Sequence, residues 1–392
     1  MYNGPRVNKA ESSCCGQSQK PAVFSPDKNA FQQAAQSLSG ITTKKPAWIT
    51  GILNTRAGIV PLVSNEWSRA DRLGQIRSRL GTFRMEYIVK PGLYAIGTPD
   101  AASDIFVSAN YKLSFDILRR ELKGINGWIL VLDTKGINVW CAAGKGTFGT
   151  AELVKRITVA NLGSLVSHRR IIVPQLGATG VRATEVKNKT GFNVYFGPVE
   201  ASDIRQYCTD NYRATPEMRR IQFGLIQRLI LTPIELNQAL KRFPLAGMII
   251  LIIFGLQPSG IIFKNAWFEG WPFLFLCLAA IVIGALITPL LLPLIPGRSF
   301  ALKGWLTGVA AIAPLVALTP AGGESMFLKA SAMVLFPLIS SYLALQFTGA
   351  TTFTTISGVK KELKLWLPIY IAGLAVSIIL LVLYKLQSWR LI

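Results

Sequence analysis

The sequence predicts an α/β domain with a parallel sheet, followed by an all-α domain of about five transmembrane helices. Two observations carry this prediction. Up to about Arg242, short apolar runs alternate with segments of helical periodicity, which is typical of a parallel sheet with crossover helices. Beyond that point come long apolar runs that approach the roughly 20 residues a spanning helix needs. The 392 residues suffice for two or three domains.

The pattern of apolar runs predicts the elements in order. We expect a disordered tail over 1–45, the α/β domain over 46–213, an amphipathic linker over 214–243 and the transmembrane domain over 244–392. Strands are expected at 92–99, 104–111, 128–133, 169–177 and 192–199. Helices are expected at 112–124, 149–166, 179–191 and 201–210. The segments "TKGINVWCAAGKG", "PQLGATG" and "YFGPVEASD" should meet at the carboxyl-terminal edge of the sheet, where α/β proteins bind ligands.

The linker and the apolar segments predict attachment to a membrane. The linker is basic and amphipathic, which favours a helix on the membrane surface, with a packed helix of the soluble domain as the alternative. Thr232 to Glu235 carries a capping-box pattern that predicts a new helix start. The apolar segments are 245–263, 273–295, 300–319, 326–347 and 365–384. Lys and Arg in their flanks favour a multi-pass protein of the cytoplasmic membrane, with the α/β domain in the cytoplasm.

The charge and the cysteine content indicate which classes of partner and which redox compartment to expect. The chain has 42 Lys and Arg against 20 Asp and Glu, a net charge of +22. The basic residues form no stripe interleaved with aromatics, so we expect no nucleic acid, and anionic membrane lipid or an acidic partner explains the charge better. The cysteines are Cys14, Cys15, Cys141, Cys208 and Cys277. Two are adjacent and one lies in an apolar segment, so we expect a reducing compartment without a disulfide framework.

The stretch "INVWCAAGK" follows an apolar strand and suggests a binding site. Asn138 can cap a helix whose first turn holds Cys141, and the helix dipole there favours a thiolate, which is a soft ligand for a soft metal. The small residues after Cys141 leave little bulk, so a large flat group can lie against the helix. The pattern suggests a metallated macrocycle coordinated by sulfur, with Lys145 meeting an amide or phosphate of that ligand.

Three other interpretations of Cys141 compete with this one. It can be a buried structural cysteine in a helix that packs closely on the sheet. It can be a catalytic nucleophile, which needs a base, and the only histidine is His168 in "SHRR", which nothing in the sequence ties to Cys141. The stretch "GKGTFGT" can be read as a phosphate loop, although it does not match the P-loop pattern.

A resemblance to a known family adds to these observations. "NVWCAAGK" closely resembles the cap-helix motif of the corrinoid protein of microbial mercury methylation, which is related to the corrinoid iron–sulfur protein large subunit of acetyl-CoA synthesis. "SANYKLSFDILRREL", "VPQLGATGV" and "FTGATTFTTISGVKKEL" are also similar to segments of that family. The resemblance covers the chain from about residue 50 to the end. It implies a Rossmann-like cobalamin-binding domain that is joined to a membrane domain of about five helices.

The resemblance also implies roles for particular residues. Cys141 would be the lower axial ligand of cobalt in a base-off, Cys-on cobalamin. The usual histidine-ligating signature, Asp-x-His-x-x-Gly, is absent, and His168 lies in no such motif. The expected corrin contacts are Asn138, Val139, Trp140, Cys141, Ala142, Ala143, Gly144 and Lys145 in the motif, with Gln175, Gly177, Thr179 and Gly180 in "VPQLGATGV".

The function that the resemblance implies is a corrinoid-dependent methyltransferase that converts Hg(II) to methylmercury. Its partners would be a ferredoxin-like protein with two [4Fe–4S] clusters, which reduces the corrinoid, and a methyl donor protein or methyl-folate. The alternatives are a corrinoid methyl carrier of one-carbon metabolism with another acceptor, and a non-catalytic membrane corrinoid-binding or transport protein. The adjacent Cys14 and Cys15 suit mercury capture by two thiolates, or are incidental. Cys208 and Cys277 are expected to be structural.

Overall fold

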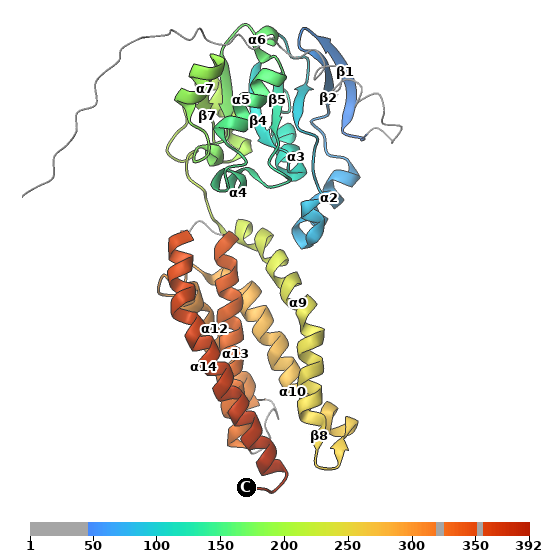
Figure 1. Ribbon diagram of the computed structural model, residues 1–392, viewed down its shortest axis with the longest axis vertical. Helices are drawn as coiled ribbons and strands as arrows, with labels where there is room; N and C mark the ends of the chain where they lie inside the picture. The colour runs from blue at the N-terminus through green and yellow to red at the C-terminus, as the bar shows by residue number, and fades with distance from the viewer. Residues whose placement is uncertain (1–45, 319–324, 351–355) are drawn as a thin grey trace, which may run out of the picture. The chain divides into compact units, whose positions relative to one another are not determined.

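The computed structural model describes residues 46–318, 325–350 and 356–392. The predicted disordered tail, with Cys14 and Cys15, lies outside these residues. The α/β part is built on a seven-stranded sheet with the strand order β1-β2-β3-β5-β4-β6-β7 (Figure 1). Its strands are β1 (Ile49–Thr55), β2 (Gly58–Val63), β3 (Gly92–Ile96), β4 (Asp104–Ala109), β5 (Gly127–Leu132), β6 (Arg170–Val173) and β7 (Asn193–Phe196).

The sheet is mostly parallel, as predicted, and differs from the prediction in its first half. Three pairs in the second half of the sheet are parallel, namely β5–β4, β4–β6 and β6–β7. However, β3 pairs antiparallel with β5, and β1 and β2 form an antiparallel hairpin that was not predicted. The connection from β3 to β4 explains the reversal. It is only 97–103, whereas a parallel crossover needs a dozen or more residues.

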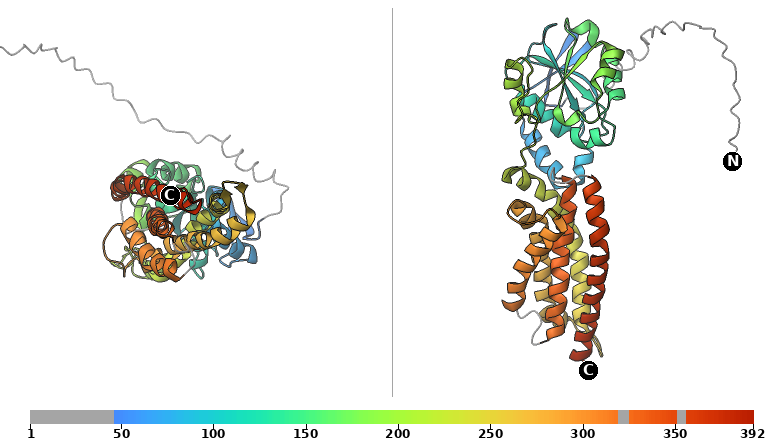
Figure 2. Two further views of the ribbon diagram at one scale, coloured as in Figure 1. Left: turned by 90° about the horizontal axis from the view of Figure 1, so that it is seen from below. Right: turned by 90° about the vertical axis from the view of Figure 1, so that its left-hand side faces the viewer.

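Helices cover both faces of the sheet (Figure 2, right-hand view). One face packs against α4 (Val139–Gly144), α5 (Thr150–Val159), α6 (Leu162–Leu165) and α7 (Ala183–Thr190), and the other against α3 (Lys112–Glu121) and α8 (Ile204–Thr209). The single helix expected over 149–166 is wrong, because α5 ends near Asn161, whose φ of 43° is left-handed. The α/β core also continues beyond residue 213. Met218 is buried in it and accepts a hydrogen bond from the Val199 backbone at 2.8 Å.

A buried group of four charged side chains, which was not predicted, connects α2 (Arg69–Leu80) to α3. This charge quartet is Asp71, Lys112, Asp116 and Arg119, each no more than 7% exposed. Lys112 Nζ lies 2.9 Å from Asp71 Oδ1 and 2.7 Å from Asp116 Oδ1. Arg119 bridges the same two carboxylates and donates to the carbonyls of Ser64 and Glu66.

Within its described residues, the helical part holds five helices that are long and apolar enough to cross a membrane, as predicted. Its elements are α9 (Leu225–Gly255), β8 (Leu256–Gln257), β9 (Gly260–Ile261), α10 (Phe263–Val282), the π-helix η4 (Ile283–Ile287), α11 (Thr288–Leu291), α12 (Phe300–Leu318), α13 (Met326–Gln346), η5 (Phe347–Ala350) and α14 (Ile356–Ser388). The new helix start expected at Thr232 is wrong. Helix α9 runs through Pro233 and Pro244 without a break, so much of the predicted linker belongs to the first candidate span.

Small residues let α12 approach α13, the most buried of these helices. A Cβ at Gly304 would lie 2.9 Å from Ser340 O, and one at Gly308 would lie 2.8 Å from Pro337 Cα. Ser340 Oγ donates to Gly304 O at 3.0 Å, and Ser341 Oγ donates to Ala301 O at 2.7 Å. Small residues spaced by four and interhelical hydroxyl bonds are how helices associate in lipid, where burial of apolar surface gives no driving force.

Candidate functional site

Asn110 directly follows β4 and organises the loop that leads into the cysteine helix α4. Its Oδ1 accepts hydrogen bonds from Thr134 N at 3.0 Å, Thr134 Oγ1 at 2.8 Å and Gly136 N at 2.9 Å. Lys135 and Gly136 both have positive φ, 56° and 74°, so the chain turns sharply between β5 and α4. Asn110 is 3% exposed. Sequence reasoning missed this positioning residue, whose one signal is an asparagine directly after a buried strand.

Helix α4 carries Cys141 at the carboxyl-terminal edge of the parallel strands. Asn138 adopts an extended conformation, and its Oδ1 accepts a hydrogen bond from Cys141 N at 2.9 Å, which is the predicted N-cap. Cys141 is partly exposed. The cap thus fixes the backbone at the cysteine and leaves its thiol reachable from outside the domain.

Ala142 and Ala143 face the core of the domain, contrary to the expectation that they form an open flat face. Both are buried, and Ala143 packs against the turn that contains Gly180. A Cβ at Gly180 would lie 3.2 Å from Ala143 Cα and would overlap the carbonyl oxygen of Phe148. A Cβ at Gly177 would overlap the ring of Phe148. The small residues therefore allow α4 to dock on the 175–180 turn, so the two predicted motifs do meet.

The open part of the motif lies at the end of α4. A Cβ added at Gly144 would have no heavy atom of the described part of the chain within 4 Å. Lys145 and Thr179 are exposed, and Lys145 ends the helix. These residues, together with the thiol of Cys141, offer a surface to a ligand that approaches from outside.

Gln175 presents a buried polar atom at the same edge of the sheet. It begins the short 3-10 helix η2 (Gln175–Gly177), shortly after β6. Its Oε1 is shielded from solvent and has no hydrogen-bond partner among the residues that the structure describes. Buried polar atoms are nearly always satisfied, so an unpaired acceptor at this edge of the sheet marks a position where a ligand donor can bind.

A cavity of about 290 Å³ lies beside α4 on the same edge of the sheet. It is lined by Asn138, Val139 and Trp140 of the motif, by Phe106 and Ser108 of β4, and by Ile172, Pro174, Leu176 and Gly197. Cys141 is not part of this lining. The cavity therefore adjoins the start of α4, next to Cys141 in the chain.

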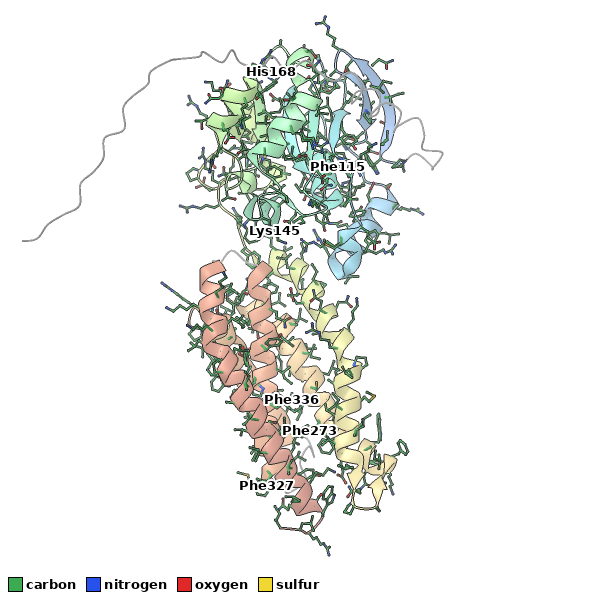
Figure 3. All side chains as sticks on the ribbon, viewed as in Figure 1. Phe115, Lys145, His168, Phe273, Phe327 and Phe336 are labelled. Carbon is green, nitrogen blue, oxygen red and sulfur yellow. The ribbon has the colours of Figure 1, made fainter. Side chains whose placement is uncertain are left out.

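The histidine and the other described cysteines lie in different surroundings. His168 Nδ1 accepts the Arg170 backbone N–H at 3.1 Å, so its Nε2 donates to Ser103 O at 3.0 Å. Figure 3 shows His168 and Lys145 at opposite ends of the α/β domain. His168 is therefore not a base for Cys141. Burial raises the pKa of the Cys208 thiol to about 11, with a contribution from Asp104, and Cys277 is buried among apolar side chains. Both agree with structural roles.

Replacing Asn138 by alanine should loosen the start of α4. The variant leaves Cys141 N without its acceptor, and loss of an N-cap costs about 1 kcal/mol. We expect amide hydrogen exchange at Cys141 to rise about fivefold, because 1.4 kcal/mol corresponds to a factor of ten. Asn138→Ser keeps an oxygen acceptor and should exchange almost as slowly as the native chain. Equal exchange in Asn138→Ala and the native chain would show that the cap does not hold the helix.

The fold and the site together define a class: an α/β domain with a capped cysteine helix at the edge of its sheet, joined to apolar helices. Residues 81–208, from η1 (Thr82–Met85) to α8, match the family described as CO dehydrogenase/acetyl-CoA synthase delta subunit. The match includes the motif and the cavity lining.

Curated relatives agree with the family match. The acetyl-CoA decarbonylase/synthase complex subunit gamma of Archaeoglobus fulgidus is 31% identical over 126 residues, which are 32% of this chain and 26% of that protein. The same subunit of Methanopyrus kandleri is 33% identical over 122 residues, 30% of this chain and 26% of that protein. The corrinoid/iron-sulfur protein large subunit of Moorella thermoacetica is 30% identical over 125 residues, 31% of this chain and 28% of that protein. About a third of the chain is thus similar to about a quarter of the length of these relatives, one of which is a corrinoid/iron-sulfur protein.

Proposed function

We propose that the α/β domain binds a cobalamin with Cys141 as the lower axial ligand of cobalt, and that the protein transfers the cobalt-bound methyl group to Hg(II) to form methylmercury. The observation that carries the proposal is the partly exposed thiol on a capped helix, at the ligand-binding edge of a domain whose relatives include a corrinoid protein. The proposal rests on the motif "NVWCAAGK" for the sulfur ligand and for mercury as the acceptor.

The residues at this edge fit a corrinoid. Cobalamin carries many peripheral amides, and the buried Gln175 Oε1 can accept a hydrogen bond from one of them. Exposed Lys145 can donate to an amide oxygen or to the phosphate of the nucleotide tail. The cavity of about 290 Å³ is too small for the macrocycle and has the size and the apolar lining for the displaced dimethylbenzimidazole base. The close packing of α4 on the 175–180 turn then supports the site, and it depends on the small residues Ala142, Ala143, Gly177 and Gly180.

Each protein residue has a defined task in this proposal. A bound methylcobalamin supplies a methyl group on cobalt. Cys141 would hold the cobalt through its sulfur, and the electron density of that ligand would favour transfer of the methyl group, with its bonding electron pair, to an electrophile such as Hg(II). Asn138 holds the helix that carries the sulfur, and Asn110 holds the loop before it. Reducing equivalents and methyl groups are proposed to come from the ferredoxin-like partner and from a methyl donor protein or methyl-folate.

The membrane domain is proposed to anchor the α/β domain at the cytoplasmic face of the membrane. Among the described residues of the five candidate spans, most buried polar side chains bond to backbone carbonyls or to one another, as Ser331 does with Ser377 at 2.8 Å. Such bonds hold helices together. Anchoring keeps the corrinoid domain where imported metal and a soluble ferredoxin both have access.

Two measurements on the purified full chain test the proposal. After reconstitution with cobalamin, the optical and cobalt EPR spectra should report sulfur ligation rather than a coordinated base. With reduced ferredoxin, a methyl donor and Hg(II), the protein should then produce methylmercury. Absence of corrinoid binding would overturn the whole proposal.

A methyl carrier of one-carbon metabolism is the second candidate, because the curated relatives are subunits of acetyl-CoA decarbonylase/synthase complexes. A protein that shows Cys-on cobalamin and passes methyl groups to an acetyl-CoA-forming partner, but not to Hg(II), would support it instead. The two candidates share the cofactor and differ in the acceptor, so the same preparation distinguishes them.

Replacing Gly144 by leucine should impair cobalamin binding without unfolding the protein. A Cβ at this position meets no described atom of the protein, so we expect the leucine to project towards the space that a ligand would occupy. We expect at least about a tenfold loss of cobalamin affinity, or about 1.4 kcal/mol, with an unchanged melting temperature. Ala143→Leu is the contrasting variant. Ala143 is 5% exposed, so the larger side chain should lower the melting temperature by overpacking. Native cobalamin affinity in Gly144→Leu would contradict docking on this face.

A further inference from the structure

Helix α2 buries its polar face and exposes its apolar face, which is the reverse of the usual arrangement in a soluble domain. Its inward face carries Asp71, Gly74 and Ser78, which are buried. Its outward face carries Leu73, Ile76 and Leu80, which are 60%, 55% and 43% exposed. Both sets have the i, i+3, i+7 spacing that places residues on one side of a helix. The apolar side of α2 therefore points away from the domain, and the charge quartet occupies the side where apolar residues usually lie.

The exposed charged side chains on α2 itself all carry positive charge. Arg69, Arg72 and Arg77 are exposed on the same helix. Asp71 is the helix's only carboxylate, and it is buried in the charge quartet. None of the ion pairs found among the described residues involves these three arginines. The apolar stripe continues beyond the helix into Met85, which is 61% exposed.

A short segment tethers the α/β domain to the first candidate span. Met218 is buried in the α/β core, and the first candidate span, α9, begins at Leu225. The seven peptide steps between these residues reach at most about 25 Å when fully extended. An apolar stripe on the α/β domain is therefore held at high effective concentration next to any membrane that the spans enter.

We propose that α2 and η1 form a membrane-docking element, in which Leu73, Ile76, Leu80 and Met85 insert into the headgroup region and the arginines contact anionic phospholipids. An apolar face flanked by Arg is the pattern of helices that lie in a membrane interface. Docking gives the α/β domain a fixed orientation on the bilayer, in addition to its covalent attachment through α9. The proposal is independent of the corrinoid proposal and requires only that the spans enter a membrane.

The test measures how deeply α2 lies in the bilayer in the full chain. A nitroxide is attached through p-acetylphenylalanine at position 76, so that the native cysteines stay in place, and the protein is reconstituted into nanodiscs rich in anionic lipid. Collision rates with oxygen, which concentrates in lipid, and with a water-soluble nickel complex are compared. We expect the ratio of oxygen to nickel collisions to be several-fold higher at position 76 than at Val159, an apolar position of α5 that is 52% exposed. A probe at Leu374 in α14 should give the high ratio of oxygen to nickel collisions that is typical of lipid, and this control shows that the spans are inserted.

Charge reversal provides the second arm. Arg69→Glu combined with Arg72→Glu, or replacement of anionic by zwitterionic lipid, should move the ratio at position 76 towards the value at Val159. Both arginines are exposed, so the fold should not change.

Three results would overturn the proposal. The first is that the probe at position 76 is as accessible to nickel as the probe at Val159. The second is that the probe becomes protected only when a soluble protein such as a ferredoxin is added, which would assign the surface to that partner. The third is spin–spin broadening that grows with protein density, which would assign the surface to a second copy of the chain.

Discussion

Replacing Cys141 by alanine is expected to abolish sulfur ligation of the cobalt and to lower methylmercury formation by at least about 100-fold. Changes in the outer shell of a metal site already cost about 10–100-fold, and this variant removes the ligand itself. The measurement is the cobalt EPR spectrum of the reconstituted full chain, together with the rate of methylmercury formation. Cys208→Ala is the matched control, since Cys208 lies partly buried in α8 with a pKa raised by that burial. A native spectrum and rate in Cys141→Ala would show that another group holds the metal.

A histidine at the same position separates the presence of a ligand from its chemistry. Cys141→His retains an axial donor on the capped helix, with nitrogen in place of sulfur. We expect this variant to bind cobalamin with a spectrum typical of nitrogen ligation and to lose methyl transfer to Hg(II). Full activity of Cys141→His would mean that the position of the donor matters and that its softness does not.

Replacing Arg119 by methionine is expected to destabilise the α/β domain by about 3–5 kcal/mol. Arg119 is fully buried and bridges Asp71 and Asp116, so the variant leaves two buried carboxylates with Lys112 as their only cation. Breaking a buried ion pair from one side costs this much because the remaining charge is uncompensated. Amide hydrogen exchange in β4 and α3 of the full chain should rise accordingly.

The neighbouring arginine is the control for this prediction. Arg120 pairs with Glu121 at the surface, and its side chain is 48% exposed. Arg120→Met should therefore change the free energy of unfolding by less than about 1 kcal/mol. Similar exchange in the two variants would contradict a special role for the charge quartet.

The charge quartet also predicts that the α/β domain loses stability at acid pH. Burial alone would raise the pKa of the Asp71 carboxyl, but hydrogen bonds from Lys112 and from the Ser68 backbone outweigh burial and hold it at about 2. Because this value lies below the usual 3.8, the stabilisation is complete above about pH 4 and is lost as the pH falls towards 2. It amounts to about 2 kcal/mol. Asp71→Asn should remove this part of the pH dependence, measured as the melting temperature between about pH 5 and 2.

The elements that sequence reasoning found share a local origin. Strands β4 and β5 are short apolar runs with clear ends, and Asn138 stands one turn before Cys141, so a cap is recognisable from spacing alone. The five apolar segments are likewise visible from composition, because a spanning helix needs an uninterrupted apolar stretch. The carboxyl-terminal edge of the sheet followed from the order of strands and helices, and it brought the motif and the 175–180 turn together.

The sequence by itself determined the α/β domain, the apolar helices and the place of Cys141, since each depends on residues close together in the chain. Only the tertiary structure decided the direction of β3, the inward packing of Ala143 against Gly180 and the role of Asn110, which holds a loop 24 residues away. It also decided that Asp71 meets Lys112, 41 positions further along the chain. This contact places the polar face of α2 against the domain and leaves its apolar face exposed. The physical reason is the same in each case. Hydrogen bonds and ion pairs between distant segments form only after the sheet has assembled, and a linear pattern of apolar and polar residues carries no record of which partners meet.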